Sequence, residues 1–177
     1  MVGAQEPAPR LTPARALTTI DSMPVILRPI SAGAARAVLA GNAPDGLKLA
    51  ADYPTEFSAE VARRVGGSDL GPFFLHRAGD DVVVGEIGGA FVLAGMVEIG
   101  YAVVRFCWGQ GYATDGVRSL VSMAREIPHI ERFVAHTPLD RPASGRVLEK
   151  AGFAPVGESD LRHDGIAMRV RRWELSV

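Results

Sequence analysis

A strand, a glycine-containing turn and a long amphipathic helix follow one another in the middle of this chain, and this succession constrains the fold most. Between Met96 and Val104 the side chains alternate between two faces, as they do along a strand. From Tyr112 to Arg125 apolar residues recur three and four positions apart, which is typical of a helix packed on a sheet. Strands and helices therefore share one core, and the sequence predicts an α/β fold with a mixed sheet.

The other periodic segments fit the same single domain. Apolar alternation bounded by turn residues predicts strands at 25–29, 73–77, 82–87, 132–136, 153–156 and 166–173. Start and stop signals predict helices at 34–40, at 58–65 and from about 142 to 152. Consecutive strands joined by short turns predict a mostly antiparallel central sheet. Residues 1–20 are rich in proline and alanine, so we expect a flexible tail there and one domain over residues 21–177.

Composition narrows the function classes. The 177 residues carry 19 Lys plus Arg against 20 Asp plus Glu, without the basic excess of a nucleic-acid binder. The single cysteine, Cys107, cannot form an internal disulfide, and no Cys/His pair has the spacing of a zinc site, so we expect no metal. No apolar run reaches the roughly 18 residues of a membrane span, and the first residues lack the apolar core of a secretory signal. We therefore expect a cytoplasmic protein that binds neither nucleic acid nor membrane.

The turn before the long helix is a candidate anion site. It comprises Trp108, Gly109, Gln110, Gly111, Tyr112, Ala113 and Thr114. Glycines allow a close approach of the backbone to a ligand, and the first amides of a helix have no partner within it, so they can bind phosphate. The dinucleotide fingerprint and the Walker pattern are both absent. An ordinary strand-to-helix turn uses the same residues, so this turn alone leaves both interpretations open.

Three segments in order resemble the GNAT superfamily of acyl-CoA-dependent N-acetyltransferases, most closely its RimJ/RimL-like branch of ribosomal-protein alanine N-acetyltransferases. They are residues 98–104, 108–114 and 147–153. The resemblance implies a central sheet with a splayed pair of parallel strands, flanked by about four helices. It also implies acetyl-CoA as co-substrate, with its pyrophosphate on the turn from Trp108 to Thr114 and its pantetheine arm paired with the backbone near Val103.

The chain departs from the family pattern at three positions. Trp108 stands where most members have Gln or Arg, and the RimJ-like branch shows this same change. Arg141 stands where the family has an asparagine that helps to hold pantetheine. The tyrosine that many members use as general acid falls at Leu148. The resemblance therefore implies that Ser144 donates a proton or hydrogen bond to the departing thiolate. A serine in the first turn of a helix is also common for capping alone.

Acetyl transfer to an amine benefits from a base, because only the unprotonated amine attacks. Glu98 shares a strand face with Gly100 and Ala102, whose small side chains leave room for a ligand, so we predict Glu98 as this base. Glu86, on the neighbouring strand, and His136, at a strand end, are rival bases. The alternative for Glu98 is a solvent-facing strand position, and a lone histidine is more often structural.

The acceptor is either a small-molecule amine or a protein N-terminus, and the absence of a long insertion favours the small molecule. Asp45, Asp52 and Glu56 lie in loops where they could bind a cationic acceptor. A catalytically silent acyl-CoA-binding module is the second hypothesis, and a hydrolase that uses Cys107 and His136 the least favoured. We expect Trp108 and Trp173 to be packing residues, and apolar edge strands make a homodimer plausible.

Overall fold

The computed structural model describes residues 25–67, 69–163 and 165–177, so the predicted flexible tail at 1–20 lies outside the described residues. Within them, eight strands and four α-helices alternate with one short 3₁₀ helix. The elements are β1 (Val25–Pro29), α1 (Ala32–Leu39), β2 (Lys48–Leu49), α2 (Ser58–Arg63), β3 (Phe73–Arg77), β4 (Val82–Leu93), β5 (Met96–Val103), η1 (Arg105–Cys107), α3 (Tyr112–Ala124), β6 (Arg132–Pro138), α4 (Pro142–Lys150), β7 (Ala154–His163) and β8 (Ile166–Ser176).

One sheet runs through the molecule in the order β1-β3-β4-β5-β6-β8-β7, and the short β2 pairs with β4. Neighbouring strands are antiparallel except for two parallel pairs, β5 with β6 and β2 with β4. The prediction of a single α/β domain with a mostly antiparallel sheet is confirmed.

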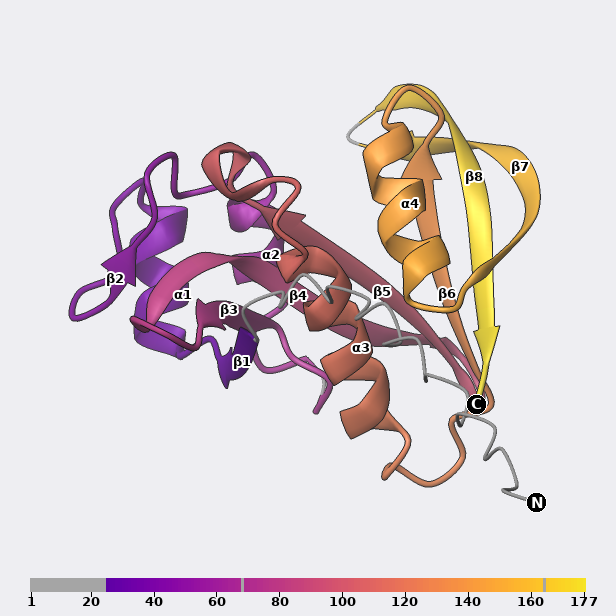
Figure 1. Cartoon of the computed structure of the whole chain (residues 1–177), viewed down its shortest axis with the longest axis horizontal. Coiled ribbons are helices and arrows are strands. Elements are labelled where there is room, and N and C mark those ends of the chain that lie inside the picture. The colour runs from indigo at the N-terminus through magenta and orange to yellow at the C-terminus, as the bar shows by residue number, and fades with distance from the viewer. Residues whose placement is uncertain (1–24, 68, 164) are drawn as a thin grey trace, which may run out of the picture.

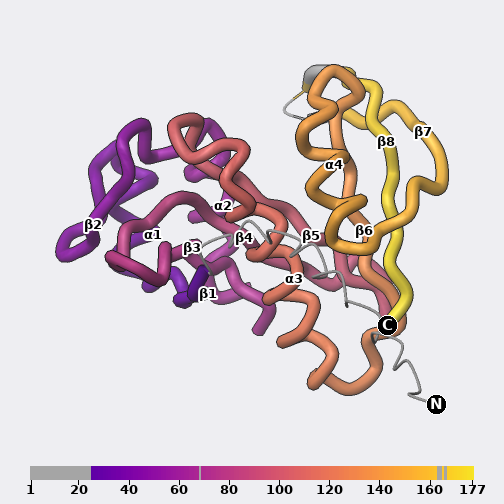
Figure 2. The backbone as a smooth tube through the Cα atoms, in the orientation of Figure 1, coloured from indigo at the N-terminus to yellow at the C-terminus, as the bar shows by residue number. Residues whose placement is uncertain are grey.

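The parallel pair opens into a V. Strands β5 and β6 pair only where Met96, Val97 and Glu98 lie beside 132–134. Both strands continue beyond that register, to Val103 and Pro138, without further pairing between them. Figure 1 shows the two halves of the sheet meeting near the C-terminus and diverging from there, and the tube in Figure 2 follows the same divergence. The splay that the family resemblance implied is therefore present.

Helices cover both faces of the sheet. On one face α3 and α4 bury the main core, which includes Val97, Ile99, Leu120, Phe133 and Leu148. On the other face α1 and α2 pack with Phe74 and Val83 in a smaller core. The alternation of β5 assigns its residues to these two faces: Val97 and Ile99 are buried in the main core, whereas Glu98 and Gly100 lie on the face of α2. The predicted placement of Glu98 beside small residues is confirmed.

Several elements extend further than the sequence predicts. Strand β4 continues past Ile87 to Leu93, and its last residues, Phe91 to Leu93, are exposed. Strands β7 and β8 form a longer antiparallel ribbon, because their register continues as far as His163 beside Ile166. The two-residue strand β2 gave no periodic signal. Pairing with a neighbour, rather than the local pattern, sets these boundaries.

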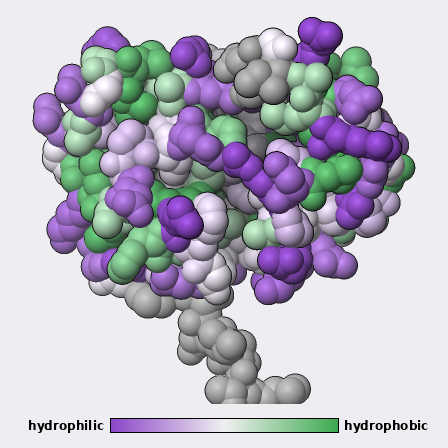
Figure 3. Space-filling view, turned by 90° about the horizontal axis from the view of Figure 1, so that it is seen from above, coloured by the Kyte–Doolittle hydropathy of each residue, from purple (hydrophilic) through white to green (hydrophobic). Residues whose placement is uncertain are grey.

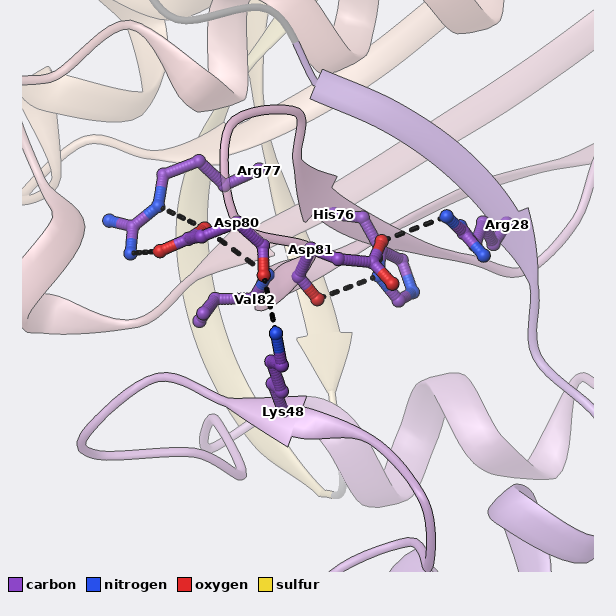
Figure 4. Close-up of polar contacts among 7 residues, drawn as sticks. All are labelled: Arg28, Lys48, His76, Arg77, Asp80, Asp81 and Val82. Carbon is purple, nitrogen blue, oxygen red and sulfur yellow. Dashed lines mark hydrogen bonds and ion pairs between the residues drawn. The ribbon is translucent and has the colours of Figure 1, made fainter.

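The turn between β3 and β4 is held by charged side chains (Figure 4). Asp81, whose φ is 63°, accepts from His76 at 3.0 Å and pairs with Arg28 at 2.9 Å. Arg77 donates from Nε to Asp80 at 2.8 Å. The ion pair with Arg28 thereby ties the turn to β1.

No helix in the described part of the chain is long and apolar enough to cross a membrane.

Candidate active site

The free edge of β5 faces the opening of the V. The Val104 N–H donates to the Val84 carbonyl in β4 at 2.9 Å, so the backbone groups of the alternate residues Val103 and Tyr101 turn the other way, toward β6. The Val103 carbonyl accepts from Trp108 Nε1 at 2.7 Å, which agrees with this orientation. Beyond Glu98 this edge has no strand partner, so an extended chain with amide groups can pair with it.

The N-terminus of α3 lies at the wide end of the V. Gly111 caps the helix with φ of 90°, and Gly109 has φ of 77°, values that side chains rarely allow. The first bond of the helix runs from the Asp115 N–H to the Gly111 carbonyl, 3.0 Å, so the amides before it have no acceptor within the helix. A Cβ added at Gly109 would meet nothing within 4 Å, so the turn is open. This geometry leaves room for an anion, such as the pyrophosphate that the family resemblance implies.

The remaining side chains of this turn have distinct roles. Tyr112 and Thr114 are buried and anchor the helix, so they offer the turn only their backbone. Trp108 is 63% exposed, which shows that the prediction of a packing residue was wrong for this tryptophan. The indole is held by its bond to Val103, and Arg105 lies 6.0 Å from the ring centroid. Trp173, in contrast, is buried and donates to Thr137 Oγ1 at 2.9 Å, as a packing residue should.

Cys107 is buried under the same turn. Burial raises the pKa of its thiol, so the nucleophilic thiolate is disfavoured. The predicted reading as a small buried hydrophobic residue fits this position better than a nucleophile.

Glu98 and His136 meet across the narrow end of the V. Glu98 lies beside Val134 in the parallel register, and His136 follows two positions later on the same face. Their side chains are 2.8 Å apart, from Glu98 Oε1 to His136 Nδ1. Glu98 is 40% exposed and His136 20%, so the pair is accessible. When Nδ1 carries the proton and donates to Glu98, Nε2 has a lone pair that can accept a proton.

Two residues that the sequence offered as rival bases therefore form one unit. The third rival, Glu86, is different. It is 1% exposed beneath α2, where it hydrogen-bonds Ser58 and accepts from Thr55 Oγ1 at 3.2 Å. Burial raises the pKa of Glu86, although these hydroxyl donors oppose the shift. Burial likewise raises the pKa of the neighbouring Tyr53. Glu86 fastens the segment before α2 to the sheet.

The first turn of α4 closes the opposite side of the V. Tyr101 OH donates to the Ser144 carbonyl at 2.7 Å, so its side chain spans from β5 to α4. Burial raises the pKa of Tyr101, which keeps its hydroxyl protonated. Leu148, one turn further along α4, is fully buried in the main core. The hydroxyls near this turn are thus those of Ser144 and Tyr101.

Arg141 connects the two halves of the sheet. It forms an ion pair with Glu56, and its guanidinium lies 5.5 Å from the ring centroid of Phe57. Glu56 and Phe57 precede α2, whereas Arg141 precedes α4, so the contact spans the opening. Seen from above, hydrophilic side chains extend across the middle of the molecule (Figure 3). Of the three acidic loop residues expected to bind a cation, Glu56 is already paired with Arg141.

A cavity of about 300 Å³ opens on the α2 face of the sheet. Its floor includes Gly88 and Gly100, which pair with each other, and Ala90, which pairs with Glu98. Its wall includes Arg64, at the end of α2, and Pro72. The register places this cavity next to the Glu98–His136 pair.

Among the described residues, no group of three or more His, Cys, Asp or Glu side chains is arranged to hold a metal ion.

An unpaired strand edge, a helix N-terminus at its wide end and an acid–base pair at its narrow end define an acyltransferase class of site. The chain belongs to the GNAT family: the family description "Acetyltransferase (GNAT) domain" matches residues 25–154. The splay, the glycine turn and the α4 segment that carry the resemblance in the sequence all lie within this match.

Solved structures agree on the fold. A GNAT-family acetyltransferase from Bacillus anthracis is 16% identical and aligns over 86% of this chain and 95% of its own, with a TM-score of 0.63. Mutant forms of a spermidine/spermine N-acetyltransferase from Vibrio cholerae are 15% identical and align over 86% of this chain and 94% of their own, with a TM-score of 0.62. The microcin C7 self-immunity acetyltransferase, in complex with acetyl-CoA and AMP, is 14% identical and aligns over 87% of this chain and 93% of its own, with a TM-score of 0.64. No curated protein sequence matches the chain.

Three features of the site were not predicted from the sequence. The contact of Tyr101 with Ser144 and the contact of Arg141 with Glu56 join residues 43 and 85 positions apart. Arg64 lies at a helix end with no motif around it. The alternation of β5 assigns Tyr101 to the face of the main core, and this was the one available signal.

Proposed function

We propose that this protein transfers an acetyl group from acetyl-CoA to the primary amine of a small molecule, by direct attack in a ternary complex. The observation that carries the proposal is the Glu98–His136 contact at 2.8 Å, placed at the narrow end of a strand opening whose wide end is a helix N-terminus. A candidate base, a strand edge for the donor and a candidate anion site thus border one strand opening.

Acetyl-CoA, when bound, supplies the activated thioester carbonyl. The backbone turn from Trp108 to Thr114 would hold its pyrophosphate through the free amides of α3, without a side chain from Gly109 or Gly111 in the way. The edge of β5 at Tyr101 and Val103 would pair with the amides of its pantetheine arm. The residues present fit the donor, although Arg141 offers it no asparagine amide.

The chain's own groups would then act in turn. His136, oriented by Glu98, accepts the proton of the amine as the nitrogen attacks, either directly or through a water. Backbone N–H groups along the open edge of β5 can donate to the acyl oxygen as negative charge develops on it. The hydroxyl of Ser144, in the first turn of α4, is our candidate donor to the departing thiolate. No covalent enzyme intermediate is required.

The cavity beside Glu98 supports a small-molecule acceptor. Its volume of about 300 Å³ is at the lower end of ligand pockets, and Arg141 joins Glu56 across the opening. A protein N-terminus would need room for the chain that follows it. The reaction we propose takes place in the cytoplasm.

The test is a turnover assay that measures thiol release from acetyl-CoA with a panel of small amines and with peptides that begin with alanine. Acetylation of the amines by the wild type, lowered at least a hundredfold in Glu98→Gln and in His136→Asn, supports the proposal. Preference for the peptides would assign the protein to N-terminal acetylation. Binding of acetyl-CoA without any product would indicate a silent acyl-CoA-binding module, for which Arg141 and Leu148 are the supporting departures.

A further inference from the structure

We propose that the acceptor amine also carries an anionic group, a carboxylate or a phosphate, and that Arg64 binds this group. The inference rests on the proposed acetyl transfer and specifies which amines the cavity takes.

The position of the cavity carries the first step. Its floor, Gly88 paired with Gly100, is adjacent in the sheet to Ala90 paired with Glu98. A Cβ added at Gly88 would lie 3.1 Å from Pro72 Cα, a tight contact, so a side chain there would crowd the cavity. At Gly100 an added Cβ would meet nothing within 4 Å, so the surface there is bare. A molecule in this cavity can therefore place its amine at the Glu98–His136 pair.

The charge of the cavity carries the second step. Of the eight residues that line it in the described part of the chain, five are glycines, two are Pro72 and Ala90, and the eighth is Arg64. Arg64 is thus the one charged side chain among them. A polyamine acceptor would bring its second ammonium group beside this guanidinium, where the carboxylate of Glu60 is already paired with Arg64. An amine with an anionic group gains a charge-assisted hydrogen bond at the same place.

The guanidinium of Arg64 has a partner on its own helix and still has further donors. Arg64 follows the last turn of α2 and donates from Nη2 to Glu60 Oε1 at 2.6 Å, an i,i+4 pair on the same helix. A guanidinium has five N–H donors in a planar fork, of which this bond uses one. Its side chain is 61% exposed. Arg64 can therefore donate to an anion and to Glu60 at the same time.

The size of the cavity sets the third condition. About 300 Å³ accommodates a molecule of roughly the size of an amino acid, with its amine at one end and its anionic group at the other. Both a free amino acid and a phosphorylated amine meet this description. The shared chemistry is an anion separated from a primary amine by a short linker.

The experiment compares matched acceptors by thiol release from acetyl-CoA. One set pairs phenylalanine with its amide and with phenethylamine, a second pairs phosphoethanolamine with ethanolamine, and spermidine is the polycation. The variant is Arg64→Gln. Its matched control is Arg63→Gln, which removes the preceding arginine, a residue that does not line the cavity.

We expect the wild type to prefer the anionic member of a pair, and Arg64→Gln to raise KM for that member about tenfold or more. KM for the neutral member and kcat for both should change little, and Arg63→Gln should behave as the wild type. The carboxylate and phosphate pairs show which source is used. Preference for spermidine or neutral amines, or an unchanged KM in Arg64→Gln, overturns the inference and leaves acetyl transfer standing. Turnover of no amine overturns both.

Discussion

Glu86 and Glu98 project from neighbouring strands toward the same face of the sheet, and we predict that they have opposite roles. Glu86 is buried and should serve stability, whereas Glu98 is accessible and should serve catalysis. Replacing each by glutamine separates these roles, because the substitution keeps the shape of the side chain and removes its charge. Glu86→Ala adds a variant in which the hydrogen-bond acceptor is lost as well.

The magnitudes follow from the contacts. In Glu86→Ala the hydroxyls of Ser58 and Thr55 lose their buried acceptor and a cavity forms, so we expect unfolding to require about 3–4 kcal/mol less. Glu86→Gln retains one amide oxygen as acceptor and should cost about 1 kcal/mol. Glu98→Gln changes a partly exposed side chain, so its free energy of unfolding should shift by less than about 0.5 kcal/mol. Its kcat should fall about 10²- to 10⁴-fold.

The pH dependence provides a second readout. Burial raises the pKa of Glu86, so between the ordinary pKa of a glutamate, about 4.3, and the raised value the folded form binds more protons than the unfolded form. Stability should therefore fall as pH rises through that window and stay level above it. Glu86→Gln cannot titrate and should lose this slope, whereas Glu98→Gln should retain it.

Urea unfolding over a series of pH values and initial rates of thiol release measure both effects on the same samples. The reasoning is refuted if Glu86→Gln loses activity as strongly as Glu98→Gln at temperatures where both are folded. It is also refuted if the stability of the wild type rises with pH through the window in which Glu86 should titrate.

Three further predictions follow from single contacts. Trp108 is exposed and bonded to Val103, whereas Trp173 is buried. Acetyl-CoA should therefore change the tryptophan fluorescence of the wild type and of Trp173→Phe, but not that of Trp108→Phe. An equal change in Trp108→Phe would contradict the position of the donor. Arg141→Ala removes an exposed ion pair that contributes less than about 1 kcal/mol to stability. It should nevertheless raise KM for the acceptor while the calorimetric Kd of acetyl-CoA stays constant. A higher Kd for acetyl-CoA would show that Arg141 serves the donor. Gly145→Ala brings a Cβ to 2.8 Å from Trp173, so thermal unfolding should reveal a loss of about 1–3 kcal/mol, and an unchanged Tm would show that α4 can shift away from the sheet.

The sequence predicts the architecture because its periodic segments are strong. The alternation around Glu98 and the helical spacing after Tyr112 are local signals, and they correctly indicate a strand and a helix with a turn between them. The opening between β5 and β6 is a different matter. Nothing in the local pattern of either strand indicates where their pairing ends. The prediction of this opening therefore came from the family resemblance alone.

The chemistry of the site was only partly predictable, because side-chain contacts over long sequence distances depend on the tertiary structure. Glu98 and His136 were each candidate bases, but their contact joins residues 38 positions apart. Glu86 and Glu98 were both candidate bases in the sequence, and only the burial of Glu86 beneath α2 distinguishes their roles. Trp108 was misjudged because a large aromatic side chain is usually buried, whereas here the indole caps a strand carbonyl at the surface.

Calorimetric titration with acetyl-CoA tests the central claim, that the donor lies along the open edge of β5 with its pyrophosphate on the N-terminus of α3. The wild type is compared with Gly111→Trp, which fills the turn, and with Gly41→Trp, a glycine with a similar positive φ (75° against 90°) that follows α1. We predict saturable binding of one acetyl-CoA per chain for the wild type and Gly41→Trp, and none for Gly111→Trp. Absence of binding to the wild type, or equal affinity in Gly111→Trp, would contradict the proposed site.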